Sequence, residues 1–233
     1  MGQALMPSVS PAMQEYLAEA YRLAYYQDGN RYISTSALAE ALNVSAPAVT
    51  RMVQRLKDAG YLEHEPYRGI CLTPAGEREA LLSIRRHRLV ERFLVDVMRF
   101  GWHEVHEDAD ALGAYVSDAV VDRMAQLAGH PRRCPHGEPI PTADGVMPTI
   151  SDHPLNEAPP GVELVISRVN THDADKLEYL DSLGLRPGTA FRLVERAPFH
   201  GPLQLWVDDD VRVIGYELAG ALRVCSPEEF ELV

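Results

Sequence analysis

The sequence predicts an α+β fold in which three regions carry different residue patterns. Up to about residue 130, apolar residues recur at helical spacing, interrupted by two strand-like runs between residues 61 and 73. Residues 131–160 are rich in Pro and Gly, and from Gly161 short apolar runs alternate with turns. We therefore expect domains at 1–74, 75–140 and 161–233, with a Pro-rich linker at 141–160.

Capping residues and apolar spacing predict three helices before residue 60. Their N-terminal caps are Ser10 with Pro11, Ser34 or Thr35, and Ser45 with Pro47 in the first turn. Asp28-Gly29-Asn30 is expected to end the first helix as a turn, and Gly60 the third. Tyr61 to Glu65 and Ile70 to Thr73 are expected to form a hairpin. This order is typical of a winged helix-turn-helix.

The formal net charge of −12 argues against nucleic acid binding over the whole surface. Residues 31–92 nevertheless carry 10 basic and 7 acidic residues, a net charge of +3. Polar and basic residues occupy the expected outer face of the third helix and the hairpin tip: Ser45, Thr50, Arg51, Gln54, Arg55, Lys57 and Arg68. Such a local basic surface can bind DNA phosphates. The alternative is a small α+β unit whose third helix is merely amphipathic.

Several protein classes are disfavoured by composition. No run approaches 18 apolar residues, and the N-terminus lacks the basic start of a secretory signal, so we expect no membrane association. The three cysteines, Cys71, Cys134 and Cys225, are odd in number and far apart, which favours a reduced, cytoplasmic protein.

Two helices are expected in the middle of the chain, from Thr73-Pro74 to about Phe100 and from about Glu107 to Leu127. Both are apolar enough to bury a face against a second subunit, which predicts a homodimer. The C-terminal region predicts a small barrel of SH3 type with one helix, about Asp173 to Leu183. Its expected strands are Val162 to Val169, Ala190 to Ala197, Leu203 to Val207, Val211 to Val213 and Ala221 to Val224.

The two middle helices carry pairs of potential metal ligands. His87 and Glu91 are four residues apart on the first helix, and His106 and Asp110 are four apart on the second. Residues at this spacing share a helix face, and imidazole with carboxylate suits Mn²⁺, Fe²⁺, Co²⁺ or Zn²⁺. The alternative is a set of surface ion pairs, because one such pair is common on helices.

Other potential ligands also have structural explanations. Glu15 is an acidic group on a mostly apolar helix. Asp173, next to His172, opens the helix of the last domain, where a carboxylate can serve as an N-cap. Cys134 and His136 lie in the Pro-rich stretch, and we interpret them as part of a structural turn because they supply too few ligands.

With these parts in this order, the chain resembles the diphtheria-toxin-repressor family of metal-dependent regulators, in its long form with a FeoA-type SH3-like domain. The resemblance covers nearly the whole chain. The motifs that carry it are Ser45-Ala-Pro-Ala-Val-Thr50-Arg51, Tyr67-Arg68-Gly69-Ile70, His87-Arg-Leu-Val-Glu91, Glu104-Val-His106, Cys134-Pro-His136-Gly137 and Leu183-Gly-Leu-Arg-Pro-Gly188.

The resemblance implies a homodimeric regulator, usually a repressor of metal-uptake genes. Such a regulator binds a palindromic operator in double-stranded DNA when loaded with Mn²⁺ or Fe²⁺, for which Zn²⁺, Co²⁺ or Cd²⁺ can substitute. His87, Glu91 and His106 match the family's ancillary metal site, and Asp173 falls where the SH3-like domain supplies a carboxylate to it. Pro47 matches a DNA-contact position, as does Ser45.

The family's primary metal site is only partly present. Glu15 stands where the family has Met or Asp, and Asp110 where it has Cys or Glu, while Gly113 and Ala114 replace two further ligands. The second site is therefore weak, or it recruits Glu19, Glu107 or Asp108, or only one of the two sites is strong. Carboxylates in place of soft ligands favour Mn²⁺ over Fe²⁺.

We expect metal to tie the first helix, through Glu15, to the two middle helices and to the SH3-like domain. The winged regions would then be less mobile, so that both recognition helices can meet successive major grooves, about 34–36 Å apart. One competing interpretation is a winged-helix regulator that senses an organic ligand, with the His and carboxylate residues structural. Another is a metalloenzyme, which is disfavoured because no nucleophile–base arrangement is evident. The sequence does not decide the operator or the target genes.

Overall fold

The computed structural model describes residues 9–25 and 31–231, and the chain divides into two compact units. The first unit is Met1–Arg86 with Pro141–Met147, and the second is His87–Ile140 with Pro148–Val233. The helix α4 (Pro74–Asp96) contributes residues to both. Among the described residues, every helix is too short or too polar to cross a membrane.

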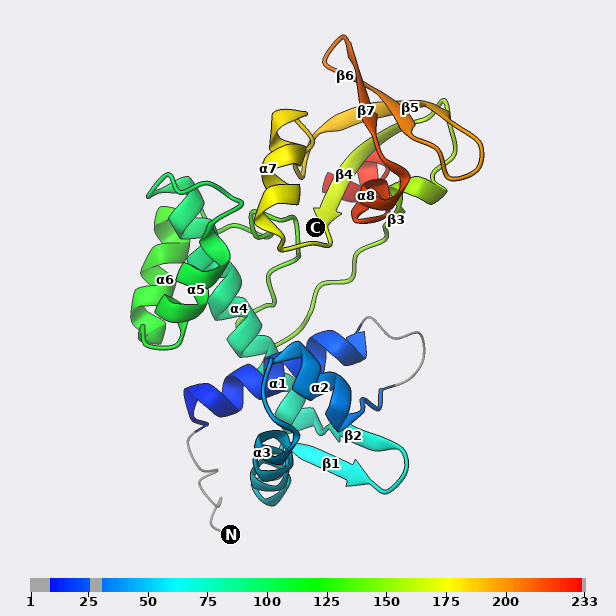
Figure 1. Ribbon diagram of the computed structural model, residues 1–233. Coiled ribbons are helices and arrows are strands. Elements are labelled where there is room, and N and C mark those ends of the chain that lie inside the picture. Colours follow the sequence, from blue (N-terminus) through cyan, green and yellow to red (C-terminus); the bar gives the residue numbers. More distant parts are fainter. Residues whose placement is uncertain (1–8, 26–30, 232–233) are drawn as a thin grey trace. The chain divides into compact units, whose positions relative to one another are not determined.

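The first unit is the predicted winged helix-turn-helix (Figure 1). Its elements before α4 are α1 (Pro11–Tyr25), α2 (Thr35–Ala41), α3 (Ala46–Asp58), β1 (Leu62–Glu65) and β2 (Gly69–Leu72). Ser34 caps α2 by accepting a hydrogen bond from the Ala37 amide at 3.0 Å. The helices bury Leu17, Leu38 and Leu56 in a shared core. The turn predicted at Asp28-Gly29-Asn30 lies outside the described residues.

The wing has a third short segment that the sequence pattern did not predict. Ile33 pairs with Ile70 of β2 through two backbone hydrogen bonds of 2.9 Å. Gly69 permits this approach, because a Cβ atom there would lie 2.3 Å from the Ile33 carbonyl oxygen. Its φ of +111° also favours glycine. Near its turn, the wing is therefore held on both sides of β2.

The helical part of the second unit differs from the prediction. The helix expected from Glu107 to Leu127 is two helices, α5 (Val105–Gly113) and α6 (Asp118–Leu127). The chain turns at Ser117, which has extended backbone angles and begins α6 as its N-cap residue. The helix α4 ends at Asp96 rather than near Phe100, and Arg99 adopts a left-handed φ of 66°.

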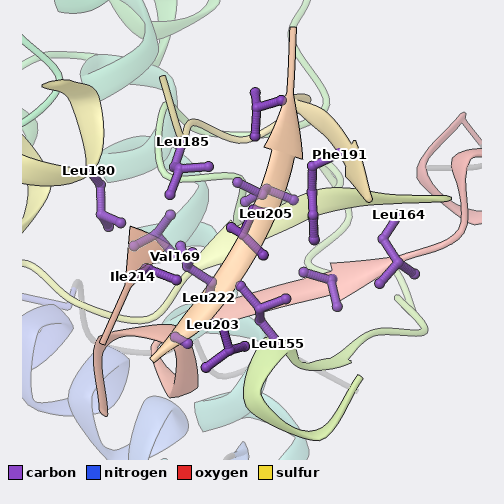
Figure 2. Close-up of a cluster of buried hydrophobic side chains, with 14 of the residues drawn as sticks. Leu155, Leu164, Val169, Leu180, Leu185, Phe191, Leu203, Leu205, Ile214 and Leu222 are labelled. Carbon is purple, nitrogen blue, oxygen red and sulfur yellow. The ribbon is translucent and has the colours of Figure 1, made fainter. Parts of the chain in front are cut away.

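The C-terminal part of the second unit forms, within the described residues, a six-stranded antiparallel sheet in the order β3-β8-β4-β5-β6-β7. The strands are β3 (His153–Pro154), β4 (Glu163–Val169), β5 (Ala190–Arg196), β6 (Leu203–Val207), β7 (Asp210–Ile214) and β8 (Leu222–Cys225). The helix α7 (Ala174–Ser182) follows β4, and Figure 2 shows the apolar core of this region. That core includes Leu155, Leu180, Leu203 and Leu222, all fully buried.

Four short elements in this region were not predicted. They are β3, the 3-10 helix after it, and the helices α8 (Tyr216–Gly220) and α9 (Pro227–Glu231). A one-turn 3-10 helix at Leu155–Glu157 follows β3, so residues expected as linker contribute to the sheet and its core. Residues 134–140 are buried as well. They therefore pack as part of the second unit instead of forming a solvated connection.

Candidate metal centre and DNA-binding face

Glu91 is the centre of a buried cluster in the second unit. His87 lies one turn before it on α4, with Nε2 3.1 Å from Glu91 Oε1. His106, from α5, places Nδ1 3.2 Å from the same oxygen. One ligand atom from each of these residues lies within 4.8 Å of the others. Helical spacing brings His87 to Glu91, and α5 adds His106, so three of the predicted metal ligands meet from two helices.

Asp110 approaches the same cluster from the solvent side. Its Oδ1 lies 2.7 Å from His87 Nδ1, and its Oδ2 lies 3.8 Å from His106 Nε2. Its side chain is 62% exposed, whereas that of Glu91 is 2% exposed. The cluster therefore has one inner and one outer carboxylate, with imidazole rings between them.

Cys134 and His136 form a second group with Glu91, which their spacing in the sequence did not predict. The three residues are buried and offer ligand atoms within 4.8 Å of one another. The segment is a turn, with Gly137 donating to the Cys134 carbonyl at 3.0 Å, but the turn also directs both side chains to Glu91. The Cys-Pro-His motif was the available signal. Its partner is far away in the sequence, so spacing did not reveal it.

The hydrogen bonding of His136 indicates a site suited to a cation. Its Nε2 lies 2.8 Å from the Trp102 carbonyl oxygen, which can only accept, so Nε2 carries the proton. Its Nδ1 then presents a lone pair 3.6 Å from Glu91 Oε1. Two acceptors that face each other in a buried site fit a metal ion, with Trp102 orienting the ring as outer-shell carbonyls do.

The pKa values in the cluster follow from burial and from this pairing. Burial lowers the pKa of His87, but Glu91 and Asp110 outweigh it and raise that pKa to about 9. Burial raises the pKa of Glu91, and the neighbouring histidines, His87 above all, hold it well below its usual range. Burial lowers the pKa of His136 and raises that of the Cys134 thiol. Glu91 therefore remains an anion at neutral pH.

Asp173, also expected as a ligand, serves as the N-cap of α7. It accepts a hydrogen bond from the Lys176 amide at 3.1 Å, and its Oδ2 lies 3.7 Å from Lys176 Nζ. The adjacent His172 instead stacks on His106, with ring centroids 4.2 Å apart. Among the described residues, Asp173 belongs to neither group of clustered ligand atoms. The N-cap alternative describes its observed contacts.

The remaining candidates of the primary site are dispersed. Glu15 is exposed on α1 of the first unit. Glu19 pairs with Arg22 at 3.1 Å. Glu107 and Asp108 are exposed on α5, and none of these four is in a ligand cluster among the described residues. The role of Glu15 as a ligand stays a prediction.

The predicted DNA-contact residues are all exposed on the first unit: Ser45, Pro47, Thr50, Arg51 and Arg55 on or beside α3, and Arg68 in the wing. The opposite face of α3 buries Val49, Val53 and Leu56. Ser45 begins α3 without a side-chain cap bond, so its hydroxyl is not used within the helix. The helix therefore presents one polar, basic face.

Comparisons with known proteins agree with this architecture. A family model described as the N-terminal DNA binding domain of iron dependent repressors matches residues 8–70. A second, described as their metal binding and dimerisation domain, matches residues 73–142, and a FeoA domain model matches residues 153–225. The three models follow one another along most of the chain.

Individual relatives and a solved structure are also similar to this chain in sequence or in structure. The iron-dependent repressor IdeR of Mycobacterium tuberculosis (strain ATCC 25618 / H37Rv) is 31% identical over 199 residues, which cover 80% of this chain and 86% of IdeR. The regulator MntR of Lysinibacillus sphaericus (strain C3-41) is 35% identical over 118 residues, 51% of this chain and 82% of MntR. A manganese-dependent transcriptional repressor in complex with manganese aligns with a TM-score of 0.82 and 33% identity, over 92% of this chain and 99% of that chain.

The DNA binding, metal binding and FeoA domain models thus match, in turn, the winged unit, the region that carries the histidine–carboxylate cluster and the C-terminal sheet. The resemblance inferred from the sequence motifs is confirmed over nearly the whole chain. The family consists of transcriptional regulators, not enzymes. This chain belongs to the metal-dependent, diphtheria-toxin-repressor-like family of transcriptional repressors.

Proposed function

We propose that the chain is a Mn²⁺-dependent repressor of metal-uptake genes that binds a palindromic operator as a homodimer in the cytoplasm. The observation that carries the proposal is Glu91, a buried carboxylate contacted by His87, His106 and His136. Imidazoles can donate lone pairs to a metal, so this environment can bind a divalent cation. Glu91 with His87, His106 and Asp110 would form one site, and Glu91 with Cys134 and His136 would extend it.

Donor chemistry supports Mn²⁺. Oxygen and nitrogen atoms predominate in the cluster, and these suit Mn²⁺ and Fe²⁺. The Cys134 sulfur is the softer donor, through which Zn²⁺ or Cd²⁺ would compete. A bound cation would supply positive charge between groups that otherwise meet only through hydrogen bonds and ion pairs.

The DNA face would act through two kinds of contact. Arg51 and Arg55 on α3 would reach base edges or phosphates, with Ser45, Pro47 and Thr50 at the same face, and Arg68 would contact phosphates or the minor groove from the wing. Metal can promote this binding only if it binds the DNA-competent arrangement more tightly than the free one. DNA must then raise the affinity for metal by the same factor.

A gel-shift titration tests the proposal. Operator-like fragments are first selected from a random-sequence library in the presence of Mn²⁺, and binding is then measured with Mn²⁺, Fe²⁺, Zn²⁺ or a chelator. We expect chelator to abolish the shift and Glu91→Gln to weaken the response to Mn²⁺ by at least about 100-fold. Glu77→Gln, an exposed glutamate on the same helix, is the matched control. DNA binding that does not depend on metal would contradict the proposal and favour a regulator that senses an organic ligand.

A further inference from the structure

Arg68, the basic residue of the wing, is already paired within its own chain. Its Nη1 lies 2.7 Å from Glu65 Oε2. Its guanidinium carbon lies 4.0 Å from the centroid of the Tyr32 ring, a cation–π arrangement. The Tyr32 hydroxyl donates a short hydrogen bond to the other oxygen, Glu65 Oε1. One carboxylate thus holds Arg68 and is itself held by Tyr32.

Backbone pairing and burial fix the positions of Tyr32 and Glu65 beside Arg68. Tyr32 is 6% exposed and precedes Ile33, whose two backbone hydrogen bonds to Ile70 add it to the wing. Glu65 is opposite Gly69 at the end of the hairpin. The hydrogen bond from Tyr32, assisted by Arg68, lowers the pKa of Glu65, so the carboxylate is ionised at neutral pH. The local charge of the Glu65–Arg68 pair is therefore zero in the free protein.

We propose that Glu65 and Tyr32 form an internal clamp on Arg68, which DNA phosphate must displace when the wing binds. The pair is partly exposed, with side chains 61% and 39% accessible for Arg68 and Glu65. Pairs of this kind contribute little to stability, so a phosphate can replace the carboxylate. The inference rests on the proposed DNA-binding role of the wing and adds Glu65 and Tyr32 as residues that position Arg68.

The clamp would act as a selectivity device. Binding to non-operator DNA depends almost entirely on charge, so neutralising one wing arginine removes about one phosphate contact from it. At an operator, base contacts made by α3 fix where the wing lies on the duplex, so a phosphate is placed to displace Glu65, whereas on non-operator DNA the Glu65–Arg68 pair stays closed. The ratio of operator to non-operator affinity is therefore expected to be higher with the clamp than without it.

The test uses the full-length, metal-loaded protein and a random-sequence duplex, followed by fluorescence anisotropy between 50 and 200 mM salt. We expect Glu65→Gln to raise non-operator affinity by about 3- to 10-fold at low salt and to steepen the log–log salt dependence by about 0.9. Tyr32→Phe should give a smaller rise, because the Glu65–Arg68 ion pair remains. Glu63→Gln is the matched control, an exposed glutamate on the same strand with the same charge.

A double variant separates the clamp from a general charge effect. If Glu65 acts through Arg68, Glu65→Gln combined with Arg68→Ala should bind like Arg68→Ala alone. Additive effects, or equal gains from Glu65→Gln and Glu63→Gln, would overturn the clamp while leaving the wing as a DNA contact. An Arg68→Ala variant with parental DNA affinity would overturn the clamp together with the wing contact. Thermal melts identify any misfolded variant. If Glu65→Gln is misfolded, Tyr32→Phe, which keeps the carboxylate, serves as the test, and an unchanged non-operator affinity of that variant would overturn the clamp.

Discussion

Two buried clusters in the second unit use carboxylates in different ways. Around Glu91 the partners are histidines. In the other cluster, Glu138 contacts Arg88 and Arg168 at 3.2 and 3.0 Å, and Asp152 contacts Arg168 and Arg223 at 2.8 and 2.9 Å. Guanidinium groups are permanent cations with no lone pair to offer, whereas imidazoles can be neutral and bind metal. Partner type therefore distinguishes the structural cluster from the candidate metal centre.

The arginine cluster also joins separate segments of the chain. Arg88 follows His87 directly on α4 and donates to the Pro139 carbonyl at 2.5 Å. Arg168 lies on β4 and connects Glu138 to Asp152. This closed network fixes the segment that contains Cys134 and His136. The candidate metal centre could then gain or lose a cation while the residues that support it stay paired.

The largest effect is expected from a substitution that disrupts the arginine cluster around Glu138 and Asp152. Arg168→Met leaves Glu138 and Asp152, both buried, short of a cation, so the free energy of unfolding should fall by about 3–5 kcal/mol. Urea denaturation measures it. Arg192→Met, an exposed arginine on the neighbouring strand β5, is the control and should change stability by less than about 0.5 kcal/mol. A loss below about 1 kcal/mol for Arg168→Met would show that the cluster is not structural.

A smaller loss of stability is expected from a substitution in the candidate metal centre, measured without metal. Glu91→Gln removes a buried anion, but the histidines around it can be neutral, so no permanent buried charge is left. The free energy of unfolding in chelator should fall by about 1–3 kcal/mol, less than for Arg168→Met. In the same urea titration, added Mn²⁺ should raise the free energy of unfolding of the parent and leave that of the variant unchanged. Equal losses for the two variants would remove the distinction between the clusters.

Metal preference should depend on Cys134. Cys134→Ser removes the soft donor, so Zn²⁺ or Cd²⁺ affinity should fall by about tenfold or more, with a smaller change for Mn²⁺. Isothermal titration calorimetry measures both. Cys225 is also buried and free but belongs to no ligand cluster among the described residues, which makes Cys225→Ser the control. Parallel losses for all three ions would place Cys134 in a structural role.

Sequence patterns predicted the parts of this molecule that depend on local periodicity. The apolar stripe of α3 and the pairing of His87 with Glu91 are properties of one helix, and both occur as expected. The break before α6 was missed because apolar residues continue through Val116, although Ser117 can cap a helix. The two-residue strand β3 exists through its pairing with β8, which no local pattern contains.

The candidate site also combines features that local sequence predicts with features that depend on tertiary contacts. Cys134 and His136 join Glu91 only through the fold, so their local spacing suggested no more than a turn. Asp173 was assigned as a ligand by the family resemblance, while its own position at a helix start indicated the cap that the structure contains. Residue types in the sequence indicated which residues could bind a metal, and only the tertiary contacts show which of them lie close together.

The smallest expected effect is the pH dependence, at acid pH, of the stability that the arginine cluster contributes. Burial raises the pKa of Asp152, but Arg168 and Arg223 outweigh it and hold that pKa below its ordinary value. A carboxyl with a lowered pKa stabilises the fold above its unfolded pKa of about 3.9, and this contribution disappears as pH falls through the lower folded value. Arg168→Met removes the main cause of the shift. The stability gap between parent and variant should therefore be constant from pH 7 to about 5 and should narrow below about pH 4, in urea titrations at each pH. A gap that stays constant to pH 3 would mean that the loss in the variant comes from packing of the arginine stem and not from its charge.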